Sequence, residues 1–299
     1  MHPHADELLL RVNGIQPAFG IELGQSGSRA DEGRADPYRQ TNVSYSLLQR
    51  RQGAIVRHTL VDCGMGVVPS LLEFERTHGV HVVDEVLLTH PRFDHFAQLD
   101  WLSMCLLRSG RAEQPWPLPI YASPACWEEG PVPVHRYLAE RSDFRPLQPG
   151  VAIVLGDLAV TPFAVDHGPK APGAIGFVVQ YGGRKCVIMG DFLRVPEEDN
   201  PLLFDADVIF LDANSWHPAE HTWHQSVLGD LRLIDKWRPK RAYLLHYSGY
   251  EDRSHADDRV CGPLSFDRLR LELRHLAGDR DIQVAEHGMV LGDTVAWPK

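Results

Sequence analysis

The amino-acid sequence predicts a layered α/β sandwich in one domain, and three observations lead to this fold class. Short apolar runs rich in β-branched residues alternate with longer segments of helical periodicity. Some of the short runs are joined by glycine-containing turns, which is typical of antiparallel hairpins. Others are separated by helical segments, which is typical of parallel crossovers. A chain that uses both connections favours a layered sandwich over a purely parallel, doubly wound sheet.

The predicted strands repeatedly end at a turn residue or at a side chain that can bind a metal. Apolar runs of about four to eight residues bounded by turn signals are typical of buried strands. Gly156-Asp157 and Gly182-Gly183 stand between paired runs and predict hairpin turns. The predicted strand segments are residues 54–64, 83–90, 152–167, 176–191, 205–213 and 241–248.

Helical periodicity is clearest in segments that end at a helix-terminating residue. A glycine closes the first, second and last of these segments, and Pro239 closes the third. The predicted helical segments are residues 68–79, 96–110, 224–237 and 265–278.

The remaining segments predict loops rather than a second domain. Residues 24–42 are polar, contain several glycines and carry mixed charge, so we expect a surface loop there. Residues 111–119 and 128–136 are rich in proline and predict irregular connections. No repeat or low-complexity tract divides the chain, and we therefore treat residues 1–299 as one domain.

Composition and charge restrict the partners and the cellular location. A length of 299 residues with 43% hydrophobic content suffices for a substantial core. The net charge of −10 argues against a long nucleic acid as the main partner, because such binding neutralises phosphates with Lys and Arg. A small anionic substrate remains compatible with it. Residues 1–14 lack the features of a signal peptide and no segment resembles a membrane span, so we expect a cytoplasmic protein without membrane contact.

Histidines and a carboxylate recur at the predicted strand ends. His90, His167 and His246 each end a predicted strand, Asp191 follows another, and His95 opens the helix after His90. Strand ends along one edge of a sheet converge, and a cluster of imidazoles and carboxylates there is what a zinc, manganese or iron site requires. A single histidine of this kind is more often structural. Five recurrences at strand ends favour a metal site.

Four short segments resemble the metallo-β-lactamase superfamily, whose signature is His-x-His-x-Asp-His followed by distant His, Asp and His ligands. These segments are THPRFDH at 89–95, DH at 166–167, MGD at 189–191 and LLHYS at 244–248. The resemblance spans most of the chain and implies a four-layer αββα sandwich with metal-dependent hydrolase activity. LVDCG at 60–64 also resembles the early strand of the family, in which Asp62 would support the metal loop without binding metal.

Within the superfamily, the arrangement looks most like the phosphodiesterase branch that includes ribonuclease Z and the cyclic phosphodiesterase of phosphonate breakdown. His224 stands where that branch carries a histidine that helps the departing oxygen, and residues 209–221 resemble the segment just upstream. Two features depart from these enzymes. The chain lacks the N-terminal cysteine cluster of the phosphonate enzyme, and it is acidic where ribonuclease Z needs a basic surface.

The resemblance assigns the ligands residue by residue. His90 and His167 would hold a first metal, Asp94, His95 and His246 a second, and Asp191 would bridge them. Arg92 stands where the second histidine of the signature should be, and a guanidinium offers only donors. We therefore expect one divalent metal at Asp94, His95, Asp191 and His246, with zinc the first choice and manganese or iron the alternatives.

Two roles for Arg92 stay open. It could turn away, pair with a nearby carboxylate and merely mark the loss of one metal. Alternatively, its fixed charge could stand in for the missing cation and bind an anionic oxygen of the substrate. A chain that has lost catalysis is a third reading, which the presence of every other ligand disfavours.

The expected mechanism is hydrolysis by a metal-activated water. Asp94 would orient the water, His224 would stabilise or protonate the leaving oxygen, and Arg92 would help to hold the developing charge. The first expected substrate is a small phosphodiester, and a lactone, carboxyl ester or thioester is the alternative. A non-catalytic metal- or ligand-binding protein is the second class, and a homodimer is left open.

Overall fold

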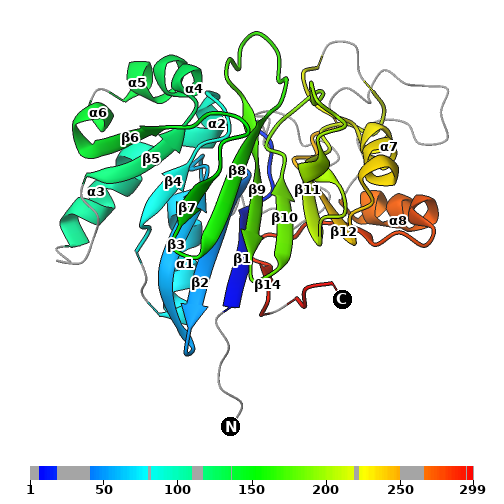
Figure 1. Ribbon diagram of the computed structural model, residues 1–299, viewed down its shortest axis with the longest axis horizontal. Coiled ribbons are helices and arrows are strands. Elements are labelled where there is room, and N and C mark those ends of the chain that lie inside the picture. Colours follow the sequence, from blue (N-terminus) through cyan, green and yellow to red (C-terminus); the bar gives the residue numbers. More distant parts are fainter. Residues whose placement is uncertain are drawn as a thin grey trace, which may run out of the picture.

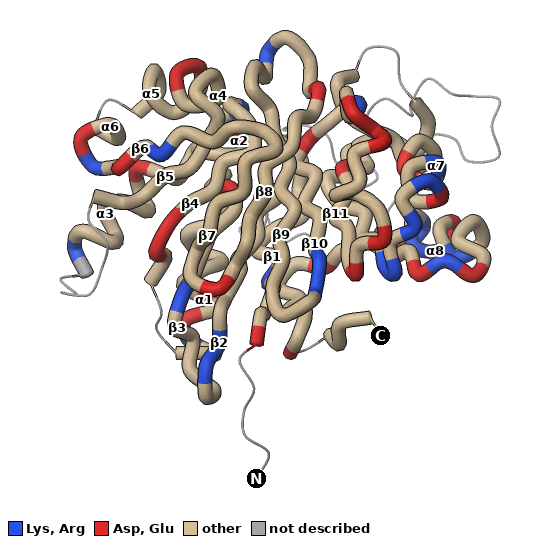
Figure 2. The backbone as a smooth tube through the Cα atoms, in the orientation of Figure 1, with Lys and Arg blue, Asp and Glu red and all other residues tan. Residues whose placement is uncertain are grey.

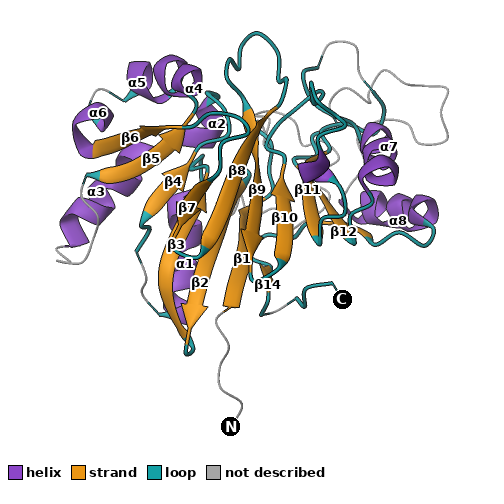
Figure 3. Ribbon diagram, viewed as in Figure 1, coloured by secondary structure: helices purple, strands orange, loops and turns teal. Residues whose placement is uncertain are grey.

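Two β-sheets packed face to face form the centre of the computed structural model. It describes residues 7–18, 41–79, 82–109, 117–135, 137–218, 222–249, 266–293 and 295–298. Helices cover the outer side of each sheet, so that the layers run helix, sheet, sheet, helix (Figure 1). Figure 3 shows the strands gathered between the two groups of helices. The predicted four-layer αββα sandwich is confirmed.

The first sheet has the strand order β14-β1-β2-β3-β4-β5-β6. Its strands are β1 (Glu7–Gly14), β2 (Ser44–Arg51), β3 (Ala54–Val61), β4 (Glu85–Leu87), β5 (Leu118–Ala122), β6 (Ser142–Pro146) and β14 (Val290–Leu291). Pairing is antiparallel from β14 to β3 and parallel from β3 to β6. Because β3 and β4 are parallel, the chain leaves both strands at the same edge of the sheet.

The second sheet has the strand order β13-β12-β11-β10-β9-β8-β7. Its strands are β7 (Ile153–Leu155), β8 (Leu158–Ala164), β9 (Ile175–Tyr181), β10 (Arg184–Ile188), β11 (Val208–Asp212), β12 (Arg241–Leu245) and β13 (Ile282–Val284). Pairing is antiparallel from β7 to β10 and parallel from β10 to β13. As a result, β8, β10, β11 and β12 all end at one edge.

The helices begin and end at residues suited to those positions. Ser226 accepts a hydrogen bond from the backbone N–H of Gly229 at the start of α7, and Arg238 adopts a left-handed conformation after its end. The described helices are α1 (Val67–His78), α2 (Phe93–Phe96), α3 (Leu99–Ser109), α4 (Pro124–Glu129), α5 (Pro131–Val134), α6 (Leu138–Arg141), the 3-10 helix η3 (Pro201–Leu203), α7 (Val227–Trp237) and α8 (Phe266–Ala277). None of them combines the length and apolar composition that a membrane crossing needs.

Three large apolar clusters and a small fourth one, around Phe74 of α1, hold the layers together. The central one joins the two sheets, where Leu10 and Leu47 meet Phe177 and Phe210. A second cluster packs α1, α3 and α4 on the outer side of the first sheet, and a third packs α7 and α8 on the outer side of the second. Burial of apolar surface between layers is the main driving force for this arrangement.

Some sequence-based expectations need correction. Residues 128–136, which were expected to form an irregular connection, contain the end of α4 and all of α5. Pro131 is compatible with α5 because it stands in the first turn, where the missing N–H of a proline would have no partner within the helix. Of the expected surface loop at 24–42, residues 24–40 lie outside the described part of the chain, whereas Thr41 and Asn42 are buried. The cysteines at 63, 105, 126 and 186 are free thiols. Cys105 is exposed, whereas the other three are buried.

Candidate metal centre

The candidate site lies at the edge of the sandwich where strands from both sheets end. His90 follows β4 of the first sheet, while His167 and His246 follow β8 and β12 of the second. Asp191 follows β10 in the same way. Parallel strands bring their carboxyl ends to one edge, and this edge is where α/β proteins commonly bind ligands. The topology thus brings together side chains that are up to 156 positions apart, from His90 to His246 (246 − 90).

Asp94, His95, Asp191 and His246 form the tightest group. Nε2 of His95 lies 3.3 Å from Oδ2 of Asp191 and 3.4 Å from Oδ2 of Asp94. Nε2 of His246 lies 3.2 Å from the same oxygen of Asp191. One ligand atom from each of the four residues lies within 4.8 Å of the others, and all four residues are buried. We call these residues the four-ligand set.

Buried polar atoms without partners converge at this set. Among the described residues, Nε2 of His95, Nε2 of His246 and both carboxylate oxygens of Asp191 have no hydrogen-bond partner. Leaving such atoms unsatisfied is costly, and native proteins rarely do so without a ligand. Two imidazoles and two carboxylates are a suitable donor set for zinc or manganese. The residues therefore fit a divalent metal ion.

A hydrogen bond on the outer side fixes which nitrogen of His95 faces inward. Nδ1 of His95 lies 2.7 Å from Oδ2 of Asp62, and the same carboxylate accepts hydrogen bonds from the backbone and hydroxyl of Thr89. Asp62 adopts a left-handed conformation with φ 59°, which is strained for a residue with a side chain. Histidines that bind metals usually donate their second N–H to such a partner. Asp62 thus occupies the supporting position expected from the sequence.

Electrostatics favour a positive charge at the four-ligand set. Burial alone would raise the pKa of Asp191, but His246 and His95 hold this pKa well below its ordinary value. Burial likewise opposes protonation of His246, yet Asp191 and Asp212 raise its pKa to about 10. A pocket that stabilises the added proton on an imidazole this strongly also stabilises a metal cation in place of that proton.

His90, His167 and Asp191 form a second, looser group, which we call the three-ligand set. Nε2 of His90 lies 3.7 Å and Nε2 of His167 lies 4.0 Å from Oδ2 of Asp191. Burial lowers the pKa of His90 well below its ordinary value and that of His167 to about 4. In contrast to the four-ligand set, this environment disfavours additional positive charge on its histidines.

Arg92 points into the cluster. Its Nη1 lies 3.4 Å from Nε2 of His167, and its Nε lies 3.9 Å from Oδ1 of Asp94. One of the two sequence-based readings required the guanidinium to turn away from the site, and it does not.

Asp212 is the site residue that the sequence reasoning missed. Its Oδ2 lies 2.7 Å from Nδ1 of His224, and its Oδ1 lies 3.3 Å from Nδ1 of His246. It is the last residue of β11 and is buried, so one carboxylate hydrogen-bonds His224 and lies within ion-pair distance of His246. Its position at a strand end is the same signal that identified Asp191, and it could have been found in that way.

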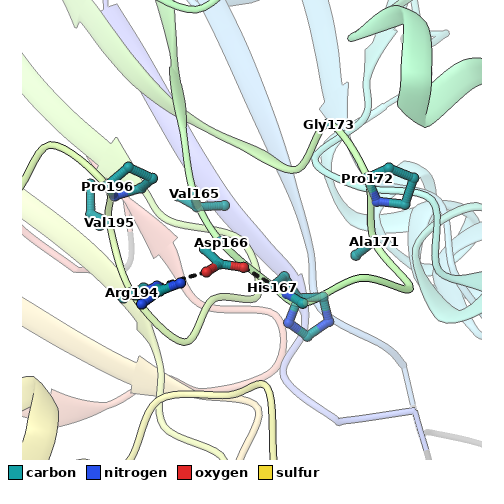
Figure 4. Close-up of a pocket in the computed structure, with 10 residues that line it drawn as sticks. Val165, Asp166, His167, Ala171, Pro172, Gly173, Arg194, Val195 and Pro196 are labelled. Atoms are coloured by element: carbon teal, nitrogen blue, oxygen red, sulfur yellow. Dashed lines mark hydrogen bonds and ion pairs between the residues drawn. The ribbon is translucent and has the colours of Figure 1, made fainter.

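A cavity of about 490 Å³ opens beside His167 (Figure 4). Its lining combines apolar side chains, among them Val165 and Pro196, with an ion pair in which Nε of Arg194 lies 2.7 Å from Oδ2 of Asp166. Small-molecule sites commonly have volumes of about 300–1,000 Å³. His167 belongs both to this cavity and to the three-ligand set, so the cavity adjoins the metal centre.

A four-layer sandwich with a histidine and aspartate cluster at one edge of its sheets defines the metallo-β-lactamase fold class. The profile of the family described as "Beta-lactamase superfamily domain" matches residues 57–247, more than half of the 299 residues. The chain belongs to this family, and the resemblance found in the sequence is confirmed.

Similar proteins fall within the expected branch. A protein named "Ribonuclease Z" from Mycobacterium marinum is 28% identical over 196 residues, which cover 59% of this chain and 64% of that protein. Another "Ribonuclease Z", from Methanopyrus kandleri, is 33% identical over 125 residues, which cover 38% of this chain and 41% of that protein. The chain thus spans less than two thirds of either relative.

Among solved structures, a diphosphatase from the PhnP family superimposes with a TM-score of 0.72. It is 20% identical, and the match covers 97% of this chain and 100% of that chain. At this level of identity the similarity shows a shared fold.

Proposed function

We propose that this protein is a metal-dependent hydrolase that cleaves a small phosphodiester. The observation that carries the proposal is the Asp212–His224 pair beside the buried four-ligand set. That arrangement combines a place for one divalent cation with an oriented imidazole that can move a proton. A protein that only stores or senses a metal needs the first part and has no use for the second.

The four-ligand set would hold one divalent ion, with zinc the first choice and manganese or iron the alternatives. When bound, such an ion supplies a Lewis acid that activates water as a nucleophile at neutral pH. The carboxylate of Asp94 orients the attacking water by accepting a hydrogen bond from it.

His224 assists the leaving oxygen. Its Nδ1 is held at 2.7 Å by Asp212, so Nε2 is the nitrogen left to meet the substrate. A carboxylate that accepts a hydrogen bond from one imidazole nitrogen fixes the orientation of the ring, and the opposite nitrogen then donates a proton to the departing oxygen. The side chain of His224 is 11% exposed, so the ring is not completely buried.

A phosphodiester is favoured over a lactone, carboxyl ester or thioester for two reasons. The departing oxygen of a phosphodiester is a poor leaving group that gains from protonation by His224. The names of the similar proteins, ribonuclease Z and a PhnP-family diphosphatase, also refer to phosphorus-oxygen bonds.

RNA is the second candidate substrate. Both curated relatives are named "Ribonuclease Z", and this weakens the expectation that no long nucleic acid binds. Charge favours the small substrate, because the net charge is −10 and basic and acidic residues are interspersed along α7 and α8 (Figure 2). A homodimer and a cytoplasmic location stay predictions.

A substrate panel tests this function. Protein treated with EDTA and then reloaded with zinc or manganese should hydrolyse bis(p-nitrophenyl) phosphate, whereas the metal-free protein should not. Parallel assays with a lactone, a thioester and a short RNA identify the substrate class. Activity confined to the lactone or thioester would replace the phosphodiester, and no activity with any metal would favour a binding protein.

A further inference from the structure

The guanidinium of Arg92 lies at the three-ligand set. Its Nη1 is 3.4 Å from Nε2 of His167, which is the nitrogen that faces Asp191. The Arg92 side chain is 32% exposed, so one part of it reaches the cluster while another part stays open to incoming molecules.

The tautomer of His167 makes this contact a hydrogen bond from Arg92. Nδ1 of His167 lies 2.8 Å from the backbone carbonyl oxygen of Trp223. A carbonyl only accepts, so Nδ1 carries the hydrogen and Nε2 of the neutral ring carries the lone pair. A metal at the three-ligand set would need this same lone pair. Arg92 therefore blocks the set by occupying one of its donors.

Among the described residues, no carboxylate lies as close to the guanidinium of Arg92 as His167 does. The separation of 3.9 Å between its Nε and Asp94 is too long for a hydrogen bond. Within the described part of the chain, the contact with His167 is the one hydrogen bond that this guanidinium makes. Its other N–H groups remain available for an anion.

We propose that Arg92 replaces the first metal ion and forms an anion subsite for a non-bridging oxygen of a phosphoryl group. This proposal rests on the proposed hydrolase function. The planar fork of N–H groups matches phosphate oxygens. Asp94 and Asp191 balance the two charges of one divalent ion, so the charge of Arg92 complements the single negative charge of a phosphodiester. The subsite thus selects charged phosphodiesters over neutral esters and lactones.

Metal content provides the first test. Wild type and Arg92→His are loaded with zinc and dialysed, and the zinc bound per chain is measured by elemental mass spectrometry. Wild type should hold about one equivalent, and Arg92→His should approach two because it supplies a fourth ligand to the three-ligand set. Two equivalents in wild type, or no gain in Arg92→His despite a native circular dichroism spectrum, would overturn the replacement.

Phosphate affinity provides the second test and does not depend on turnover. Inorganic phosphate is titrated calorimetrically into zinc-loaded wild type, Arg92→Ala and Arg92→Lys. Removal of one charge-assisted hydrogen bond should weaken binding about tenfold or more in Arg92→Ala, and Arg92→Lys should be intermediate because its fork is lost.

Arg51→Ala is the matched control for loss of one positive charge. Arg51 is the last residue of β2 and pairs with Asp157. The other end of β2 is the one near the site, because the hydroxyl of Ser44 donates a hydrogen bond to the backbone carbonyl of Asp62 there. The control should bind phosphate as wild type does. Equal phosphate binding by Arg92→Ala and wild type, or no phosphate binding by zinc-loaded wild type, would overturn the anion subsite alone. A wild type that holds no metal would instead contradict the proposed function on which it rests.

Discussion

Nδ1 of His224 lies 2.7 Å from Oδ2 of Asp212, and the other oxygen of Asp212 lies 3.3 Å from Nδ1 of His246. One buried carboxylate thus links a candidate metal ligand to a candidate proton donor. The rings of His224 and His246 also stack, with centroids 4.8 Å apart. Because the two rings share a partner, the position of the proton donor is fixed relative to the proposed metal.

His224→Ala should lower turnover mainly for substrates with poor leaving groups. Loss of a general acid typically costs about 10²–10⁴-fold in rate. A p-nitrophenolate leaves easily without a proton, so bis(p-nitrophenyl) phosphate should show a much smaller loss than an alkyl phosphodiester. Steady-state kinetics with a series of leaving groups measures the difference.

The control for this variant is His275→Ala, which removes an exposed histidine of α8. It should leave both rates unchanged, and the metal content of His224→Ala should equal that of wild type. An equal loss for all leaving groups would mean that His224 is not the proton donor.

Asp62→Ala should weaken metal binding without removing a ligand. The carboxylate holds Nδ1 of His95 at 2.7 Å and accepts two hydrogen bonds from Thr89. Loss of such a supporting group typically reduces metal affinity about 10–100-fold. Competition titrations against a chelator measure the affinity, and Asp62→Asn should be affected less because its amide oxygen still accepts. Unchanged affinity in Asp62→Ala would refute the supporting role.

Gly64→Ala should disturb the short helix α2, which carries Asp94. A Cβ atom at this position would lie 1.6 Å from the carbonyl oxygen of Asp94, so the backbone must shift. Overpacking of this kind typically costs about 1–3 kcal/mol, and metal affinity should fall with it. At Gly182, with φ +54°, an added Cβ meets nothing within 4 Å.

Gly182→Ala is the control for Gly64→Ala, because it should cost only the left-handed backbone strain of about 1–2 kcal/mol and leave metal affinity unchanged. Denaturant unfolding and chelator competition compare the two variants. Equal effects on metal affinity would show that the close approach of Gly64 to Asp94 is unimportant.

Asp230 predicts a pH dependence of stability. This residue of α7 is buried, and neither carboxylate oxygen has a hydrogen-bond partner among the described residues. Burial, followed by the charge of Asp212, raises the pKa of Asp230 well above its ordinary value. The folded state therefore binds this proton more tightly than the unfolded chain, whose pKa is about 3.9. Stability must fall as the pH rises from about 4 toward the folded pKa.

Asp230→Asn removes this titration. The free energy of unfolding of the variant minus that of wild type should rise with pH above about 4, by at most about 1.4 kcal/mol per pH unit. Urea unfolding at several pH values measures this difference. If the difference does not change with pH, the pKa of Asp230 is not raised in the folded state.

The strands that carry the site could be predicted because their signals are local. Before His90, His167, Asp191 and His246, an apolar β-rich run stops at a polar residue, and this pattern needs no knowledge of the partner strand. Convergence of these ends then follows from the sheet topology. Zinc, the number of ions and the roles of the site residues stay predictions.

Strands β1 and β2 could not be predicted in the same way because their polar residues satisfy one another. The amide nitrogen of Asn13 donates to the hydroxyls of Ser44 and Ser46 at 3.1 Å and 3.0 Å. All three side chains are buried. In the sequence they interrupt the apolar pattern, and only the pairing of distant strands shows that they belong to the core. Asp212 differs from them, because its place at the end of β11 could be found from the sequence and only its partners, His224 and His246, come from other elements.

The metal content of the purified protein and two ligand variants tests the central claim most directly. Zinc-loaded wild type, His246→Ala and His90→Ala are dialysed and their zinc is counted per chain. The account predicts about one equivalent in wild type, loss of that zinc in His246→Ala, and about one equivalent in His90→Ala, because His90 belongs only to the three-ligand set. Zinc that persists in His246→Ala but disappears in His90→Ala, or a wild type without metal, would contradict it.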